Sequence, residues 1–125
     1  MKRTFRFVCL LLFAITGTAY GHAHILKSDP ANKGTVHQSP KNVVLEFNEK
    51  VQITVLTIQK GEGKAQALVP LPRAAVKMIS VPMTVVDAGS YTINWRATGD
   101  DGHVVSGQVM FTLAPDTAAA SGKSK

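Results

Sequence analysis

The chain has 125 residues, of which 14 are Lys or Arg, 8 are Asp or Glu and 4 are His, and apolar residues make up 45% of it. This length allows one domain, and the composition excludes a disordered or collagen-like chain. Three of the basic residues, Lys2, Arg3 and Arg6, lie in the first six positions, which leaves 11 basic residues against the 8 acidic ones. The remaining charges are scattered, whereas nucleic-acid binding needs basic residues clustered on one face, so the sequence predicts no nucleic-acid partner.

The first 21 residues have the layout of a secretory signal peptide. A basic stretch, Met1–Arg6, precedes the apolar run Phe7–Ile15, and small residues that include Ala19 and Gly21 follow. Small residues at −3 and −1 are typical of the cleavage site, so we expect cleavage after Gly21. The apolar run, at about 1.5 Å per residue, is too short to cross a hydrocarbon core of about 30 Å. No second run of spanning length follows, so we expect the mature form, which begins at His22, not to be embedded in a membrane.

The mature chain consists of short apolar segments, separated by turn formers such as Gly and Pro at a spacing of roughly ten residues. The segments that predict strands are Ala23–Lys27, Asn42–Phe47, Gln52–Gln59, Ala65–Leu71, Val76–Val81, Tyr91–Ala97 and Ser106–Leu113. The polar segments that predict turns or loops are Ser28–Gly34, Lys60–Lys64, Asp87–Ser90 and Thr98–His103. No long stretch has the 3.6-residue period of a helix. The pattern predicts an all-β sandwich or barrel over residues 22–113, followed by a flexible polar tail at residues 114–125.

Alternation along three of these segments predicts which side chains face the core. The inward-facing residues are predicted to be Val43, Leu45 and Phe47, then Tyr91, Ile93, Trp95 and Ala97, and finally Val109, Phe111 and Leu113.

The histidines and carboxylates at two places in the chain are the candidates for chemistry. An amino-terminal His22 offers one metal ion both its ring Nδ1 and its α-amine, whose pKa of about 7.7–8 lets a divalent metal displace the proton near neutral pH. Asp101 and His103 lie two residues apart in one loop, so in extended chain both side chains point to the same side. Tetragonal coordination by nitrogen and oxygen suits Cu(II). The sequence therefore predicts one Cu(II) site from His22, Asp101 and His103, with Asp100 as the rival carboxylate.

Two other histidines have different interpretations. With a free amine, His24 would be third in the chain, and such a chain can bind Cu(II) through the amine, the backbone amides of Ala23 and His24, and the His24 ring. This peptide-type site removes protons from amides, at least one of which the first strand needs for its ladder, so we favour the side-chain site. Whether His24 contributes stays open. His37 stands alone in a polar segment, and we expect it to be an exposed loop residue.

Several segments resemble the CopC family of periplasmic copper-resistance proteins. They are His22–Leu26, Ser28–Ala31, Gly34, Pro40, Val44–Phe47, Glu49–Val51, Gly89–Arg96, Asp101–His103 and Ser106–Gly107. The resemblance implies a small, immunoglobulin-like Greek-key β-barrel of the cupredoxin type, and a Cu(II) site made by His22, Asp101 and His103. It further implies a periplasmic copper carrier or buffer in copper tolerance or homeostasis. The implied partners are an inner-membrane copper transporter of the CopD type or other periplasmic copper proteins.

The chain departs from some members of that family in its methionines. Those members carry a Met-rich loop that binds Cu(I), whereas the mature chain has only Met78, Met83 and Met110, which are not clustered. Because Met more often fills a core than binds a metal, we predict no Cu(I) site.

Two other functions stay open beside the copper carrier. One is a secreted immunoglobulin-like interaction module without metal. The other is a copper-dependent oxidative enzyme, because a histidine-chelated copper also occurs in polysaccharide-cleaving enzymes. Tyr91 and Trp95 fall on the apolar face of their segment, so exposed aromatic side chains for a sugar-binding face are scarce, and we expect no enzymatic activity.

Overall fold

The computed structural model describes residues 22–85 and 87–115, so the expected signal peptide and all but the first two residues of the expected tail lie outside the described residues. Its strands are β1 (Ile25–Asp29), β2 (Gly34–Val36), β3 (Asn42–Lys60), β4 (Gln66–Ala67), β5 (Val76–Pro82), β6 (Gly89–Gly99) and β7 (Val104–Leu113). Over the described ranges the chain forms no helix, and accordingly none that is long and apolar enough to cross a membrane. The all-β prediction is confirmed.

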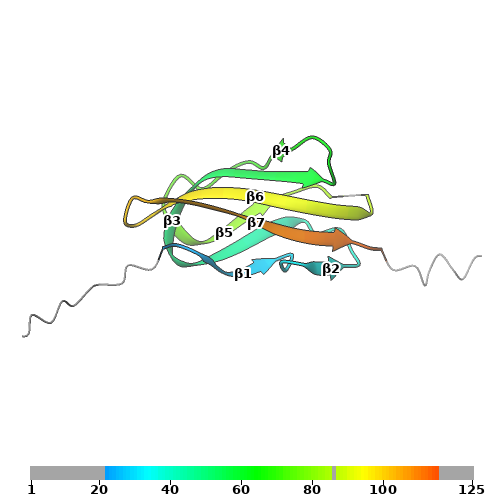
Figure 1. Cartoon of the computed structure of the whole chain (residues 1–125), viewed down its shortest axis with the longest axis horizontal. Coiled ribbons are helices and arrows are strands. Elements are labelled where there is room, and N and C mark those ends of the chain that lie inside the picture. The colour runs from blue at the N-terminus through cyan, green and yellow to red at the C-terminus, as the bar shows by residue number, and fades with distance from the viewer. Residues whose placement is uncertain (1–21, 86, 116–125) are drawn as a thin grey trace, which may run out of the picture.

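The long strand β3 organises the fold, because its two halves pair with different neighbours. Its first half, up to Phe47, lies between β1 and β5. From Val51 onward β3 pairs with β6 and, near its end, with β4. Five of the strands follow the order β1-β3-β6-β7-β2, and β4 and β5 pair with β3 off this path. Figure 1 shows β6 and β7 side by side, with β1 and β2 along the lower side of the view. A strand shared by two layers curls the sheet into a β-barrel or sandwich.

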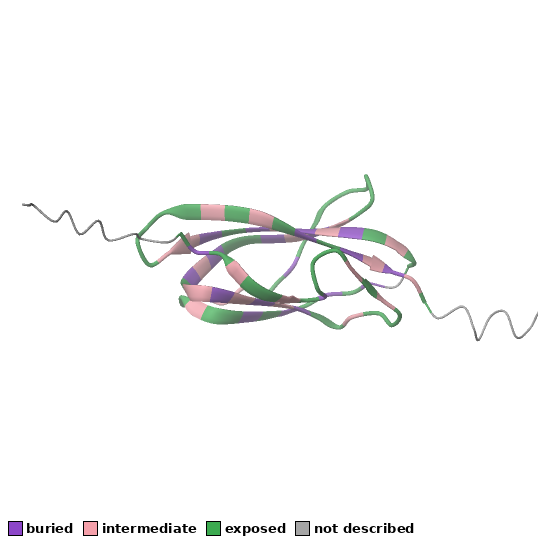
Figure 2. Cartoon of the chain, turned by 60° about the horizontal axis from the view of Figure 1, so that its bottom comes forward, coloured by how far each residue is buried: buried purple, intermediate pink, exposed green. Residues whose placement is uncertain are grey.

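Most of the core comes from alternate residues of the long strands, as the alternation predicts. Each of the inward-facing residues named from the sequence is at most 7% exposed. Figure 2 shows the result as buried bands that alternate with half-buried and exposed ones along the strands. Two aromatic pairs pack within this core: Phe47 lies edge-on to Trp95, with ring centroids 5.2 Å apart, and Tyr91 stacks on Phe111 at 5.3 Å. Such pairs add about 0.5–1.5 kcal/mol to the stability that burial provides.

Two strand predictions are corrected by long-range pairing. The segments predicted as separate strands at 42–47 and 52–59 form the single strand β3, because the intervening residues bend without breaking the strand. The pairing of β3 with β5 shifts register between Glu46 and Val51, which marks this bend. The short strand β2 lies at the end of a segment predicted as a turn, and it exists because residues 34–36 pair in parallel with β7.

Several strand boundaries also differ from the sequence prediction. β1 begins at Ile25 instead of Ala23, and a register shift between Ile25 and Lys27 interrupts its alternation. The segment predicted as a strand at 65–71 keeps only the two residues of β4, because Pro70 and Pro72 lack the N–H that a ladder needs. β6 extends at both ends into predicted turns, which leaves a loop of only four residues, 100–103, before β7.

Candidate metal centre

The bend of β3 contacts both segments that carry the predicted site, namely the segment with His22 and the loop with Asp101 and His103. On one side of the bend, the His24 N–H donates to Asn48 Oδ1 at 2.7 Å and the Asn48 N–H donates to the His24 carbonyl at 3.1 Å. Three residues further along β3, Val51 pairs with Gly99, the last residue of β6. The segment that carries His22 and the loop between β6 and β7 therefore lie at the same end of the barrel, on the left of Figure 1.

The loop between β6 and β7 is a tight turn that presents two side chains together. The Gly99 N–H donates to the His103 carbonyl at 2.9 Å, and the Gly102 N–H donates to the Gly99 carbonyl at 3.0 Å. Gly102 has a φ of 80°, in the left-handed region that glycine adopts without a steric penalty. Asp101 Oδ1 accepts the His103 N–H at 3.0 Å, which fixes the Asp101 carboxylate against the backbone of His103.

His22, Asp101 and His103 meet at this end of the barrel, where one potential ligand atom from each lies within 4.8 Å of the others. Asp101 Oδ2 is 2.9 Å from His103 Nδ1 and 4.0 Å from His22 Nδ1, and the two imidazole centroids are 5.5 Å apart. The His22 and His103 side chains are 69% and 66% exposed, whereas the Asp101 side chain is 21% exposed. The cluster is therefore a partly exposed carboxylate flanked by two imidazoles that are more open to solvent.

These contacts lower the pKa of the Asp101 carboxyl. The largest cause is the hydrogen bond from the His103 backbone N–H, followed by the hydrogen bond with the His103 ring, while desolvation opposes the shift. Attraction to the His103 and His22 rings adds to the lowering of the pKa. Asp101 is therefore ionised at neutral pH and offers a metal an anionic oxygen for which no proton competes.

The other candidates from the sequence lie outside this cluster. Within the described part of the chain, the rival carboxylate Asp100 is not among the clustered groups. The His24 ring contacts the main chain, with Nδ1 3.1 Å from the His22 carbonyl oxygen. His37 is exposed, and its Nδ1 lies 2.9 Å from the Ala114 carbonyl oxygen, beyond the far end of β7.

The methionines are spread over the fold. Met83 is 7% exposed and belongs to the core. Met78 pairs with Glu46 on β3, and Met110 pairs with Thr92 on β6.

Glu49 is the residue at this centre to which the sequence analysis assigns no role. Its Oε1 is buried and has no hydrogen-bond partner among the residues that the structure describes. A Cβ atom on Gly99 would lie 2.8 Å from Glu49 Oε1 and 3.2 Å from Asp101 Oδ1, so the two carboxylates flank Gly99. A buried carboxylate oxygen without a donor is costly. Nothing local in the sequence signals this proximity, because it depends on the pairing of Val51 with Gly99.

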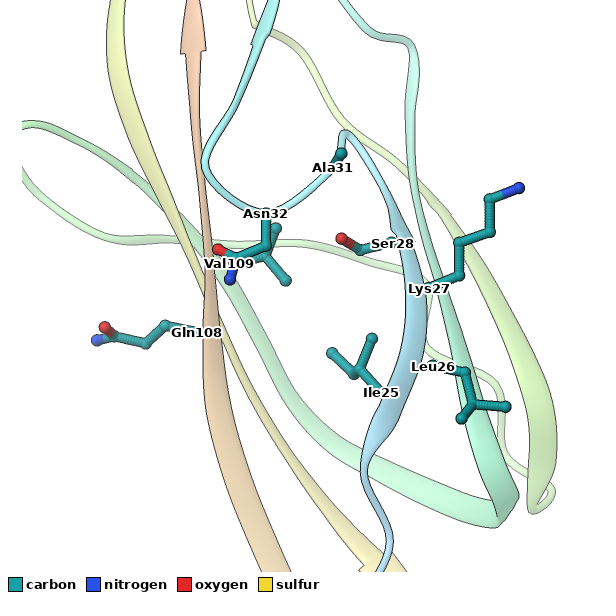
Figure 3. A pocket seen from close by; sticks show the side chains of 8 residues that line it. All are labelled: Ile25, Leu26, Lys27, Ser28, Ala31, Asn32, Gln108 and Val109. Carbon is teal, nitrogen blue, oxygen red and sulfur yellow. The ribbon is translucent and has the colours of Figure 1, made fainter.

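A separate hollow of about 420 Å³ lies between β1 and β7 (Figure 3). The Ile25 and Ser28 side chains point from β1 toward β7, whereas Leu26 and Lys27 point away from it. None of the three clustered side chains lines the hollow, so it is distinct from the candidate metal centre.

Comparison with known proteins gives the same family as the sequence resemblance, since the CopC domain matches residues 25–114. Copper transport protein CutJ of Bacillus subtilis (strain 168) is 28% identical over 123 residues, which cover 90% of this chain but only 22% of CutJ. Copper resistance protein C of Pseudomonas syringae pv. tomato is 27% identical over 112 residues, which cover 79% of this chain and 86% of that protein.

A solved structure agrees with these matches. The crystal structure of CopC from Methylosinus trichosporium OB3b superimposes with a TM-score of 0.65 at 26% identity, over 76% of this chain and 96% of that one. The family match takes in every strand of the barrel and the loop that carries Asp101 and His103. The chain therefore belongs to the CopC domain family.

Proposed function

We propose that this protein binds one Cu(II) ion per mature chain through His22, Asp101 and His103, and that it acts as a non-catalytic copper carrier or buffer in copper tolerance or homeostasis. The observation that carries the proposal is the convergence of these three side chains, whose ligand atoms lie within 4.8 Å of one another. The names of its relatives support copper as the metal, since they include a copper transport protein and copper resistance proteins.

The donor set fits Cu(II) better than other common divalent ions. After cleavage before His22, the residue supplies an amine and an imidazole nitrogen, His103 supplies a second imidazole, and Asp101 supplies an anionic oxygen. Three nitrogens and one oxygen in tetragonal coordination are typical of Cu(II), which also has the highest affinity in the divalent series. We therefore expect Zn(II) to bind at the same centre but more weakly.

The exposure of the centre fits a carrier. Both imidazoles are open to solvent, so a partner could approach the ion directly. We propose that the protein works in the periplasm after cleavage of residues 1–21, and that it exchanges copper with an inner-membrane transporter of the CopD type or with other periplasmic copper proteins.

The oxidative-enzyme alternative draws no support from the aromatic side chains that the sequence analysis considered. Tyr91 and Trp95 are each 7% exposed and pack within the core, so neither offers a sugar a flat surface. The metal-free interaction module is separated from the copper carrier by the titration described next.

The decisive experiment tests the His22 amine. The mature protein is compared with a variant that retains Gly21, which has the same metal-binding side chains but converts the chelating nitrogen of His22 into an amide. We expect Cu(II) affinity, measured by competition with a chelator, to fall at least about tenfold, or about 1.4 kcal/mol. The thermal unfolding midpoint without copper should not change.

The replacement His37→Ala serves as the control, because His37 lies near the far end of β7 and should leave affinity unchanged. Equal affinity in the mature and extended proteins would contradict the amino-terminal chelate. Failure of the mature protein to bind Cu(II) would leave only the interaction module.

A further inference from the structure

The main chain of His24 is held on both sides by Asn48. The His24 N–H donates to the Asn48 side-chain oxygen at 2.7 Å, and the His24 carbonyl accepts the Asn48 N–H at 3.1 Å. The preceding residue, Ala23, is 6% exposed and is part of the hydrophobic core. The segment that follows the expected cleavage point is therefore anchored before β1 begins.

This anchoring bears on a rival way of binding the same metal. A chain with a free amine and histidine in third place can surround Cu(II) with the amine, the backbone nitrogens of Ala23 and His24, and the His24 ring. In that arrangement both backbone nitrogens must exchange their protons for the metal, and residues 22–24 must wrap around one ion.

The structure opposes both requirements. The His24 N–H already donates to Asn48 Oδ1. Metal binding at the His24 nitrogen would break this hydrogen bond and leave the side-chain oxygen of Asn48 without its donor. Wrapping the segment around an ion would also withdraw Ala23 from the core. Neither change is needed when the ion binds to the side chains of His22, Asp101 and His103.

We propose that Asn48 is a positioning residue that selects the side-chain Cu(II) site over the peptide-type site, an inference that rests on the proposed function. The Asn48 side-chain oxygen is the group that a replacement can test, because it accepts the His24 N–H. The bond from the Asn48 backbone N–H to the His24 carbonyl does not involve the side chain. Asn48→Ala therefore removes the acceptor of the His24 N–H, whereas Asn48→Asp keeps an oxygen at the same place.

The test uses the mature protein carrying His103→Ala, in which the side-chain site is weakened and the rival arrangement is measurable. Adding Asn48→Ala should raise the residual Cu(II) affinity by about threefold to tenfold, which is the effect of one hydrogen bond of ordinary strength. The electron paramagnetic resonance spectrum should change from mixed nitrogen and oxygen coordination toward four nitrogens. Asn48→Asp should not produce this four-nitrogen spectrum, and adding His24→Ala should abolish both the gain in affinity and the new spectrum.

Asn48→Asp separates selection from general loosening of the fold, because a replacement that keeps the oxygen beside the His24 N–H should not release the peptide-type site. If Asn48→Ala leaves the residual affinity and the spectrum unchanged, or if the gain survives His24→Ala, the inference is overturned while the proposed function stands.

Amide hydrogen exchange in the metal-free protein tests the anchor without copper. The His24 amide should exchange at least about threefold faster in Asn48→Ala, on the same hydrogen-bond scale, and Asn48→Asp should restore its protection. Unchanged exchange would overturn the inference whether or not the protein binds copper.

Discussion

Glu49 Oε1 lies 2.8 Å from the point that a Cβ atom on Gly99 would occupy, so a side chain at Gly99 would force the Glu49 carboxylate to move. Asp101 Oδ1 lies 3.2 Å from the same point. The close approach of β3 and β6 at Gly99 thus brings the two carboxylates together beside the candidate metal centre.

Gly99→Ala should therefore weaken Cu(II) binding more than it weakens the fold. The nearest atom is the end of a flexible side chain, which can rotate away, so we expect a loss of stability below about 1 kcal/mol, smaller than for overpacking against rigid neighbours. Displacement of the Asp101 carboxylate should lower Cu(II) affinity, by no more than Asp101→Ala does. Chelator competition and urea unfolding measure the two effects.

Glu49→Ala provides the control for this replacement, because it removes the closest atom. Adding Gly99→Ala to Glu49→Ala should cost less affinity than adding it to the unmodified protein, since contacting residues are not additive. Equal costs in both backgrounds would show that the carboxylate of Glu49 does not transmit the effect.

Single replacements in the cluster should rank the three proposed ligands. His103→Ala removes an imidazole nitrogen and should lower Cu(II) affinity sharply, by more than about tenfold. Asp101→Ala should cost less, because all three nitrogens remain to hold the ion. Competition titration of both variants beside His37→Ala checks the order. A loss in His37→Ala equal to that in His103→Ala would mean that the site is elsewhere.

Local sequence patterns are sufficient to predict the buried face of a strand, because that face depends on the alternation of apolar and polar residues. The run Tyr91–Ala97 has one apolar face in the sequence and one buried face in the fold, because side chains alternate across a strand. His22, Asp101 and His103 could likewise be grouped in advance, since a metal-binding amine and a nearby Asp-x-His pair are recognisable by residue type. The structure brings these three together, as the grouping requires.

Features that depend on pairing between distant segments could not be predicted. The continuity of β3 depends on pairing with other strands on both sides of the bend, with β1 up to Phe47 and with β6 from Val51, and no local pattern contains that information. The same bend carries Asn48 and Glu49, which act on His24 and Gly99 at sequence separations of 24 and 50 residues. Their roles follow from the register of β3 with β1 and β6.

Gly107 should be intolerant of a side chain for a reason unrelated to metal binding. A Cβ atom there would lie 2.8–3.0 Å from three atoms of the Trp95 indole, which is 7% exposed and packs edge-on against Phe47. A rigid buried ring cannot rotate away as a carboxylate can. We expect Gly107→Ala to lower the free energy of unfolding by about 1–3 kcal/mol, as overpacking does.

The fluorescence of Trp95, the single tryptophan of the chain, reports this unfolding in urea. Ser106→Ala is the matched control, because Ser106 is the exposed neighbour of Gly107 and should leave stability nearly unchanged. If Gly107→Ala were as stable as that control, the indole would have room that the packing does not indicate.

The lowered pKa of Asp101 predicts how acid affects the metal-free protein. A carboxyl with a lower pKa in the folded than in the unfolded chain stabilises the fold above its unfolded pKa of about 3.9. That contribution is lost as the pH falls through the lower, folded pKa, because the proton then binds both states. Asp101→Asn removes the titrating group, so the unfolding midpoint of the variant should fall less between about pH 5 and strongly acidic pH. Parallel urea titrations without metal measure the difference, and identical acid dependence in both proteins would show that the bonds from His103 do not stabilise the carboxylate.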